Sequence, residues 1–280
     1  MTPRTARAIV VIVSGLIPRP PVSTTIAVMT SIRFLFYELV SRGIVPKAYP
    51  AGRSRTPSQD VSVAVKHLRE AGIVPWGWIV DETRTLHSQH YASSVYEYVA
   101  DILPGARLDL WNSEPPPLVL CESRSLAGVL RDIAATHLCP IAATSGQTGG
   151  FLHTMVGPML QQHADIQRVF YLGDLDLSGG HIEENTRKVL EEYAPLRWER
   201  LAITDVQVHE HGLTRVMKTD KRFQPPRTHP AVETEALRQQ EIQRILTDRL
   251  DAELPEPLPM VREREERQRV QVRERLNRGE

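Results

Sequence analysis

This sequence has few cysteines and no net charge. Its 280 residues include two cysteines, Cys121 and Cys139, and each lies in an apolar, strand-like run. Two cysteines are too few for a typical structural zinc site, and they are typical of small core residues in a reducing cytoplasm. The 34 basic and 34 acidic residues give a formal net charge of zero, so overall charge indicates no partner.

Long apolar segments are also missing. Residues 6–17 form an apolar stretch that is too short to span a bilayer as a helix. Arg4 before this stretch and Arg7 at its start imitate a signal peptide, but no clear small-x-small cleavage site follows. We therefore expect no membrane partner and place residues 1–28 outside the fold, as a loose N-terminal extension or an over-long start. No G-x-x-x-x-G-K-[ST] loop is present, so ATP-driven work would need a separate subunit.

An N-terminal module is predicted for residues 29–84. Residues 30–43 place apolar side chains at helical spacing from Ile32 to Val40, and a second helical pattern ends at Gly72. A short strand with a turn follows in "WGWIVDETR". Helix, basic turn, helix and strand is the order of a winged helix-turn-helix.

The charge of this module is uneven. Between residues 33 and 69 there are seven Lys and Arg residues against two acidic residues. Such a local excess favours a surface that faces DNA phosphates, although an ordinary solvated face remains the alternative. The basic set proposed to contact DNA comprises Arg42, Lys47, Arg53, Arg55, Lys66 and Arg69.

The rest of the chain divides into three parts. Residues 85–117 predict a connecting helix over 86–103 and a stiff linker that ends in three prolines. Residues 118–254 alternate strands and helices, which predicts a mainly parallel sheet flanked by helices, so the fold class is α/β. Residues 255–280 mix charges densely and predict an exposed helix or a disordered tail.

The stretch "YLGDLDLSGG" places two carboxylates directly after a buried strand. Asp174 and Asp176 follow the run that ends at Leu172, and Glu122 closes the earlier run "PLVLCE". Because ligands gather at the carboxyl ends of parallel strands, the three carboxylates predict a site for Mg²⁺, with Mn²⁺ as an alternative. The competing interpretation is that these residues only form a turn and cap a helix.

These motifs resemble a known family. A glutamate after a first strand and "GDLDLSG" after a later one are similar to the Toprim domain of primases, type II topoisomerases and several nucleases. The ordered set "TSIRFLFY", "LVLCESRSLAGVL", "SGQTGGF", "YLGDLDLSG", "ERLAITDVQVHEHGL", "KTDKR" and "VETEAL" resembles the topoisomerase VI A subunit and its compact relatives in bacteria and phages. The resemblance covers residues 30–254 and implies a winged helix joined to a Toprim domain.

The resemblance also implies roles. Tyr37 takes the position of the nucleophile that cuts double-stranded DNA and Arg33 that of its partner, while the family's metal ligands fall on Glu122, Asp174 and Asp176. It further implies a homodimer in which the tyrosine of one protomer meets the metal site of the other, a nucleoid-associated cytoplasmic location, and a separate ATPase subunit for full topoisomerase activity. The sequence departs from the family pattern at three positions: Leu177, Glu235 and Arg238.

The residues around Tyr37 support the same role independently. Tyr37 lies off the apolar stripe of its helix and four residues after Arg33, so the two side chains can be neighbours. A phenol with a pKa of about 10 is a poor nucleophile unless a cation stabilises its phenolate. The alternative is an aromatic ring packed against the next helix.

Three other functions stay open. A Toprim-type hydrolase would cut DNA without a covalent intermediate, and a non-catalytic module would only bind it. A haloacid-dehalogenase-like phosphatase would use Asp174 as nucleophile and Asp176 as acid, but its late paired-aspartate motif is missing downstream.

Overall fold

The protein is described here by a computed structural model. The described residues are 9–12, 30–50, 52–79, 89–144, 149–163, 165–220 and 225–278. The motif segment 145–148, the end of "KTDKR" and most of the strand predicted within 76–84 lie outside these ranges.

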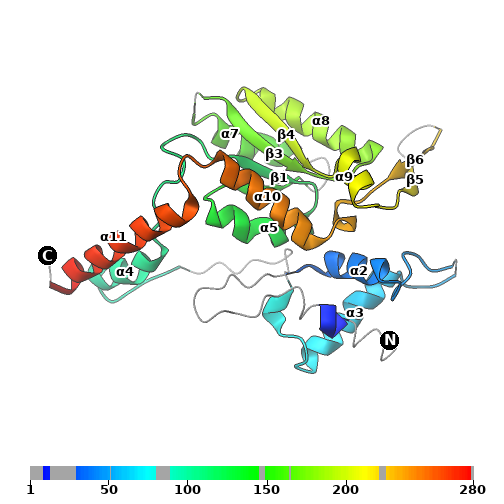
Figure 1. The fold of residues 1–280 in the computed structure, drawn as a ribbon, viewed down its shortest axis with the longest axis horizontal. Helices are drawn as coiled ribbons and strands as arrows, with labels where there is room; N and C mark the ends of the chain where they lie inside the picture. Colours follow the sequence, from blue (N-terminus) through cyan, green and yellow to red (C-terminus); the bar gives the residue numbers. More distant parts are fainter. Residues whose placement is uncertain are drawn as a thin grey trace.

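A four-stranded parallel sheet forms the centre of the molecule (Figure 1). Its strands are β1 (Leu118–Cys121), β2 (Ile141–Ala143), β3 (Gln167–Leu172) and β4 (Leu196–Ala202), in the order β2-β1-β3-β4. All three pairings are parallel, which confirms the predicted α/β class with a parallel sheet flanked by helices. The pairing of β1 with β3 brings the ends of these two strands together, where the predicted carboxylates follow.

Helices cover both faces of the sheet. On one face, α5 (Arg124–Thr136) and α10 (Gln239–Glu253) pack on Val119, Cys121, Phe170 and Leu172. On the other face, α6 (Gly149–Phe151), the π-helical turn η3 (Leu152–Val156), α7 (Gly157–Leu160) and α8 (Leu177–Glu191) pack on the alternate strand residues. Because side chains alternate along a strand, fully apolar runs such as "LVLC" can serve both layers.

Beyond β4 the chain forms α9 (Asp205–Glu210) and a two-stranded ribbon. Strands β5 (Val216–Asp220) and β6 (Arg227–Ala231) pair antiparallel. The short helix η4 (Thr234–Ala236) follows β6, and a bridge between Leu175 and Val232 fixes it beside the loop after β3. This ribbon and η4 supply the side chains that surround the strand ends.

The N-terminal module contains α2 (Ile32–Ser41), α3 (Pro57–Glu70) and the turn η1 (Trp76–Trp78). Ser31 and Thr56 cap the two helices, because each side-chain oxygen accepts a backbone N–H of the first turn. A single parallel bridge joins Thr30 to Ile79. The described residues of this module thus show two packed helices and one bridge. These elements alone do not establish a winged helix. Ile9 and Ile12, from the segment predicted to be loose, are buried in the core of this module.

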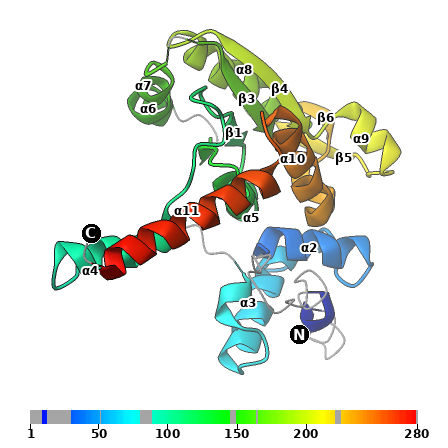
Figure 2. The ribbon, with the colours of Figure 1, turned by 60° about the vertical axis from the view of Figure 1, so that its left-hand side comes forward.

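The remaining helices form an arm beside the sheet domain (Figure 2). Helix α4 (Val95–Ile102) and the turn η2 (Leu103–Gly105) pack against α11 (Leu258–Arg278). The prediction of a helix from residue 86 was wrong at its start, because residues 89–94 are not helical and Ser94 caps α4. Of the two alternatives for the charged tail, an exposed helix or a disordered segment, the structure shows a helix, but Val261 and Glu265 are buried in it. None of the helices in the described ranges is both long and apolar enough to cross a membrane.

Candidate functional site

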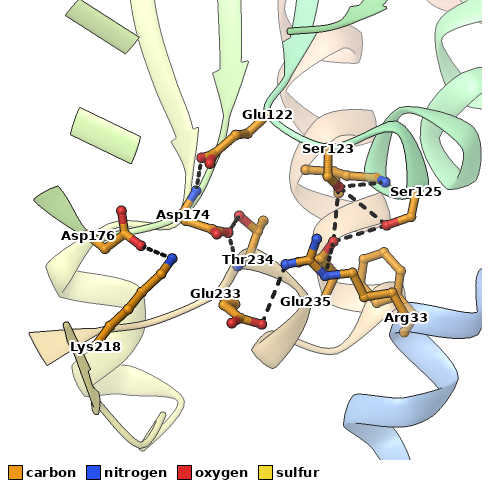
Figure 3. A network of polar contacts seen from close by, with 12 residues as sticks. Arg33, Glu122, Ser123, Ser125, Asp174, Asp176, Lys218, Glu233, Thr234 and Glu235 are labelled. Carbon is orange, nitrogen blue, oxygen red and sulfur yellow. Dashed lines mark hydrogen bonds and ion pairs between the residues drawn. The ribbon is translucent and has the colours of Figure 1, made fainter. Parts of the chain in front are cut away.

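Glu122 and Asp174 meet at the ends of two neighbouring strands. Glu122 follows β1 and Asp174 follows β3, and the Asp174 N–H donates to Glu122 Oε2 at 2.8 Å (Figure 3). The Glu122 N–H in turn donates to the Leu172 carbonyl at 2.8 Å. The parallel register of β1 and β3 therefore brings these two residues together, as the sequence predicts.

Two glycines of "GDLDLSGG" make this close approach possible. A Cβ at Gly173 would lie 2.7 Å from the Tyr171 hydroxyl and 2.9 Å from Glu122 Oε2. A Cβ at Gly179 would collide with the Asp174 carbonyl oxygen. Since Cβ atoms do not approach so closely, both positions require glycine for space rather than for backbone conformation.

The two aspartates make different contacts. Asp174 is buried, and its Oδ1 accepts hydrogen bonds from the Thr234 N–H at 2.9 Å and the Thr234 hydroxyl at 3.0 Å. Asp176 is the N-cap of α8, where its Oδ1 accepts from the Gly179 N–H at 2.6 Å. Its Oδ2 meets Lys218 Nζ at 2.6 Å (Figure 3). The structural interpretation, a turn with a helix cap, is thus fulfilled by Asp176, while Asp174 holds η4 in place.

The pKa values of Glu122 and Asp176 are shifted in opposite directions. Burial, and after it the neighbouring Asp174 carboxylate, raise the pKa of Glu122 from an ordinary 4.5 to about 7. Burial acts to raise the pKa of Asp176 as well, but hydrogen bonds from Lys218 and Gly179 outweigh it and hold that pKa below its ordinary value. Glu122 therefore changes its protonation state near neutral pH.

Arg33 links the N-terminal module to this edge of the sheet (Figure 3). Its Nε lies 3.2 Å from Glu235 Oε1, and its Nη2 lies 3.5 Å from Glu233 Oε2. Burial raises the pKa of Glu235, and the Arg33 charge opposes this rise. Ser123 and Ser125 also donate to Glu235, at 3.0 and 3.1 Å. A buried glutamate is thus held by one arginine and two hydroxyls.

Tyr37 is half-buried and opens into a different cavity from the carboxylates. It lines a cleft of about 1200 Å³ together with Lys47 and Glu235, and Lys47 Nζ lies 5.2 Å from the centre of its ring. Glu122 and Asp174 line a separate cavity of about 290 Å³, which Arg33 also lines. Within one chain, Arg33 therefore borders the carboxylates, while Tyr37, one helical turn further on, does not.

Members of the basic set lie in varied surroundings. Arg42 pairs with Glu38, and Lys66 lies 3.6 Å from Glu70. Arg69 donates to the carbonyls of Trp76 and Ile79, so that it also holds η1 in place. The other members contact aromatic rings or one distant acid: Lys47 at Tyr37, Arg53 at Tyr49 and Arg55 at Asp60.

Sequence reasoning missed three residues of the site. Lys218 forms an ion pair with Asp176, and the Thr234 hydroxyl donates to Asp174. Arg200 donates to the carbonyl oxygen of Gly173 at 2.9 Å. Lys218 and Thr234 belong to "KTDKR" and "VETEAL", the motifs that carried the family resemblance but received no role. Their position in these motifs was the available signal.

The carboxylates match a hard cation in their chemistry, because all donors are oxygen atoms. In the described ranges, however, no group of three or more His, Cys, Asp or Glu residues is arranged to hold a metal ion. The Asp174 side chain is turned to Thr234 and that of Asp176 to Lys218 (Figure 3). Glu122, Asp174 and Asp176 would hold an ion only after the Asp174 side chain turns and Lys218 withdraws. Comparisons with protein-family models, with curated proteins and with solved structures gave no match.

Proposed function

We propose that this protein cuts double-stranded DNA in a metal-dependent reaction in which Tyr37 becomes joined to the broken strand. The observation that supports this best is the position of Arg33. It borders the cavity of Glu122 and Asp174, contacts Glu235 at 3.2 Å, and belongs to the same helix as Tyr37. One helix thereby connects the candidate nucleophile with the candidate metal ligands.

In this reaction the Tyr37 oxygen forms a bond to phosphorus, and the bond from phosphorus to a deoxyribose oxygen breaks. Lys47, beside the Tyr37 ring, accepts the tyrosine proton, and the released sugar oxygen takes a proton from water. Burial lowers the pKa of Lys47; the Asp174 carboxylate opposes this fall, while the charges of Arg33 and Lys218 add to it. Glu122, Asp174 and Asp176 are the residues that would hold a divalent ion, which would stabilise negative charge on the phosphate and the leaving oxygen.

The proposal includes a homodimer. Tyr37 and the carboxylates line separate cavities of one chain. A partner chain that brings its tyrosine to the carboxylates would let two protomers cut opposite strands. ATP-driven strand passage would require another subunit, and the reaction is placed in the cytoplasm at the nucleoid.

The test uses supercoiled plasmid with Mg²⁺ or Mn²⁺ and compares gels with and without protease treatment. Wild-type protein should yield cut DNA whose ends carry protein, and Tyr37→Phe should bind DNA but not cut it. Tyr91→Phe is the matched control, because the Tyr91 side chain is exposed and lies outside the site. Cutting by Tyr37→Phe with unchanged metal dependence would overturn the role of Tyr37.

A second candidate is a hydrolase that uses water as the nucleophile. Tyr37 does not line the cavity of Glu122, and this favours the hydrolase, because a hydrolase does not require a tyrosine at the metal ion. It predicts cut DNA with protein-free ends in both wild type and Tyr37→Phe. DNA binding without cutting in either metal would instead leave a non-catalytic DNA-binding module.

A further inference from the structure

The β5–β6 ribbon turns one face toward the start of α8. Lys218 and His229 are direct partners in the antiparallel register, so their side chains lie on the same face of the ribbon. Two bonds join this face to α8: Lys218 Nζ to Asp176 Oδ2 at 2.6 Å, and the Ser178 hydroxyl to Asp220 Oδ2 at 2.7 Å. The His229 side chain therefore lies on the face of the ribbon that meets Asp176, within electrostatic range of that carboxylate.

His229 has an unusual environment for a histidine. It is 7% exposed, and neither ring nitrogen has a hydrogen-bond partner among the described residues. Nearly all buried polar side-chain atoms in proteins have such a partner, and one without a partner is destabilising. A buried imidazole with two unused nitrogens, on the ribbon face that meets a carboxylate, points to a ligand at this face.

The charges of Asp176 and Lys218 indicate which class of ligand His229 could share. An anion would face the Asp176 carboxylate, which is almost fully buried. A cation already occupies this position, because Lys218 Nζ contacts Asp176. A neutral imidazole nitrogen and a carboxylate oxygen together are typical ligands of divalent transition metals.

We propose that His229 is a nitrogen ligand of a divalent metal ion that replaces Lys218 at Asp176. The inference rests on the proposed metal-dependent function and adds His229 to its oxygen ligands. Since imidazole binds transition metals better than Mg²⁺, the site should bind Mn²⁺ more tightly than Mg²⁺, and His229 should account for part of that difference.

The test uses the full-length protein and Mn²⁺ alone. Pulsed electron paramagnetic resonance of bound Mn²⁺ should show coupling to a ¹⁴N nucleus, which an all-oxygen site lacks. His229→Leu should remove the coupling and weaken Mn²⁺ binding about tenfold or more in calorimetry. His163→Leu, at an exposed position outside the site, should change neither. A thermal unfolding curve shows whether each variant is folded.

A second variant tests the replacement of Lys218. Lys218→Met removes the competing cation and should tighten Mn²⁺ binding about twofold to fivefold, a modest effect because Lys218 is partly exposed. Weaker or unchanged binding would contradict the replacement.

The outcomes separate this inference from the function on which it rests. No Mn²⁺ binding by wild type would refute the metal site itself. Mn²⁺ binding without ¹⁴N coupling, or coupling that survives in His229→Leu, would refute the role of His229 and leave the metal-dependent function standing.

Discussion

Glu122→Gln should stabilise the metal-free protein above neutral pH while weakening its binding of metal. Glutamine has the shape of glutamate and its side-chain oxygen can still accept the Asp174 N–H. It lacks the charge that burial and the Asp174 carboxylate make unfavourable in the folded state. A carboxylate that would serve the proposed metal site is thus expected to oppose folding when the metal is absent.

The raised pKa of Glu122 sets the size and the sign of the effect. A folded pKa of about 7 against an ordinary 4.5 means that the folded state holds this proton more tightly than the unfolded state. The resulting stability is present in full below about pH 4.5 and is lost as the pH rises through 7. At about 1.36 kcal/mol per pH unit, the whole difference is about 3 kcal/mol. We expect a measured gain of about 1–3 kcal/mol for Glu122→Gln at pH 8, because the side chain keeps some contact with water.

The assay is urea unfolding with a chelator at pH 5 and pH 8. Glu122→Gln should exceed wild type at pH 8 and match it more closely at pH 5. Excess Mn²⁺ should reduce or reverse the gap at pH 8, because an ion that binds the folded wild type stabilises it. An equal effect at both pH values, or a loss of stability at pH 8, would refute the argument from charge burial.

Three further outcomes test other parts of the structure. Gly173→Ala should destabilise the fold by about 1–3 kcal/mol in urea unfolding, because the added methyl group has no room. Gly180→Ala, which has open space around it, should be neutral or slightly stabilising. Equal effects of the two substitutions would contradict the steric argument. Glu265→Ala should lower the free energy of unfolding by about 2–3 kcal/mol in thermal unfolding, because it removes a buried acceptor shared by several arginines. Glu266→Ala, at an exposed position, should change it by less than about 1 kcal/mol. Similar losses in both variants would show that the arm does not depend on the buried carboxylate. DNA affinity should fall with salt at a log–log slope of about −0.9 per neutralised phosphate, and reversing the charge of the basic set should weaken it; binding that ignores both changes would exclude this surface.

The sheet and the meeting of Glu122 with Asp174 could be predicted because both depend on local patterns. Apolar runs of strand length mark β1 and β3, and parallel pairing then places the residues after them at one edge. Lys218 could not be assigned in this way. Its contact with Asp176 depends on how the ribbon folds back over α8, and this is not encoded in the spacing of either motif.

The burial of Glu265 shows a second limit. In the sequence it lies within a run of charged residues that is typical of a solvent-exposed helix. In the structure the Leu108 N–H donates to it at 2.9 Å, and Arg107, Arg262 and Arg269 surround it. Only the position of the arm against residues far away in the sequence distinguishes this glutamate from its exposed neighbours.

The contact between Arg33 and Glu235 couples the position of the N-terminal module to the charge balance at the edge of the sheet. Glu235 is 3% exposed, and Arg33 provides the positive charge that counteracts the rise of its pKa. Any movement of α2 that withdraws Arg33 leaves this carboxylate buried without its counter-charge. The Ser123 and Ser125 hydroxyls would still donate to Glu235, but the loss of its ion pair makes such a withdrawal of α2 costly.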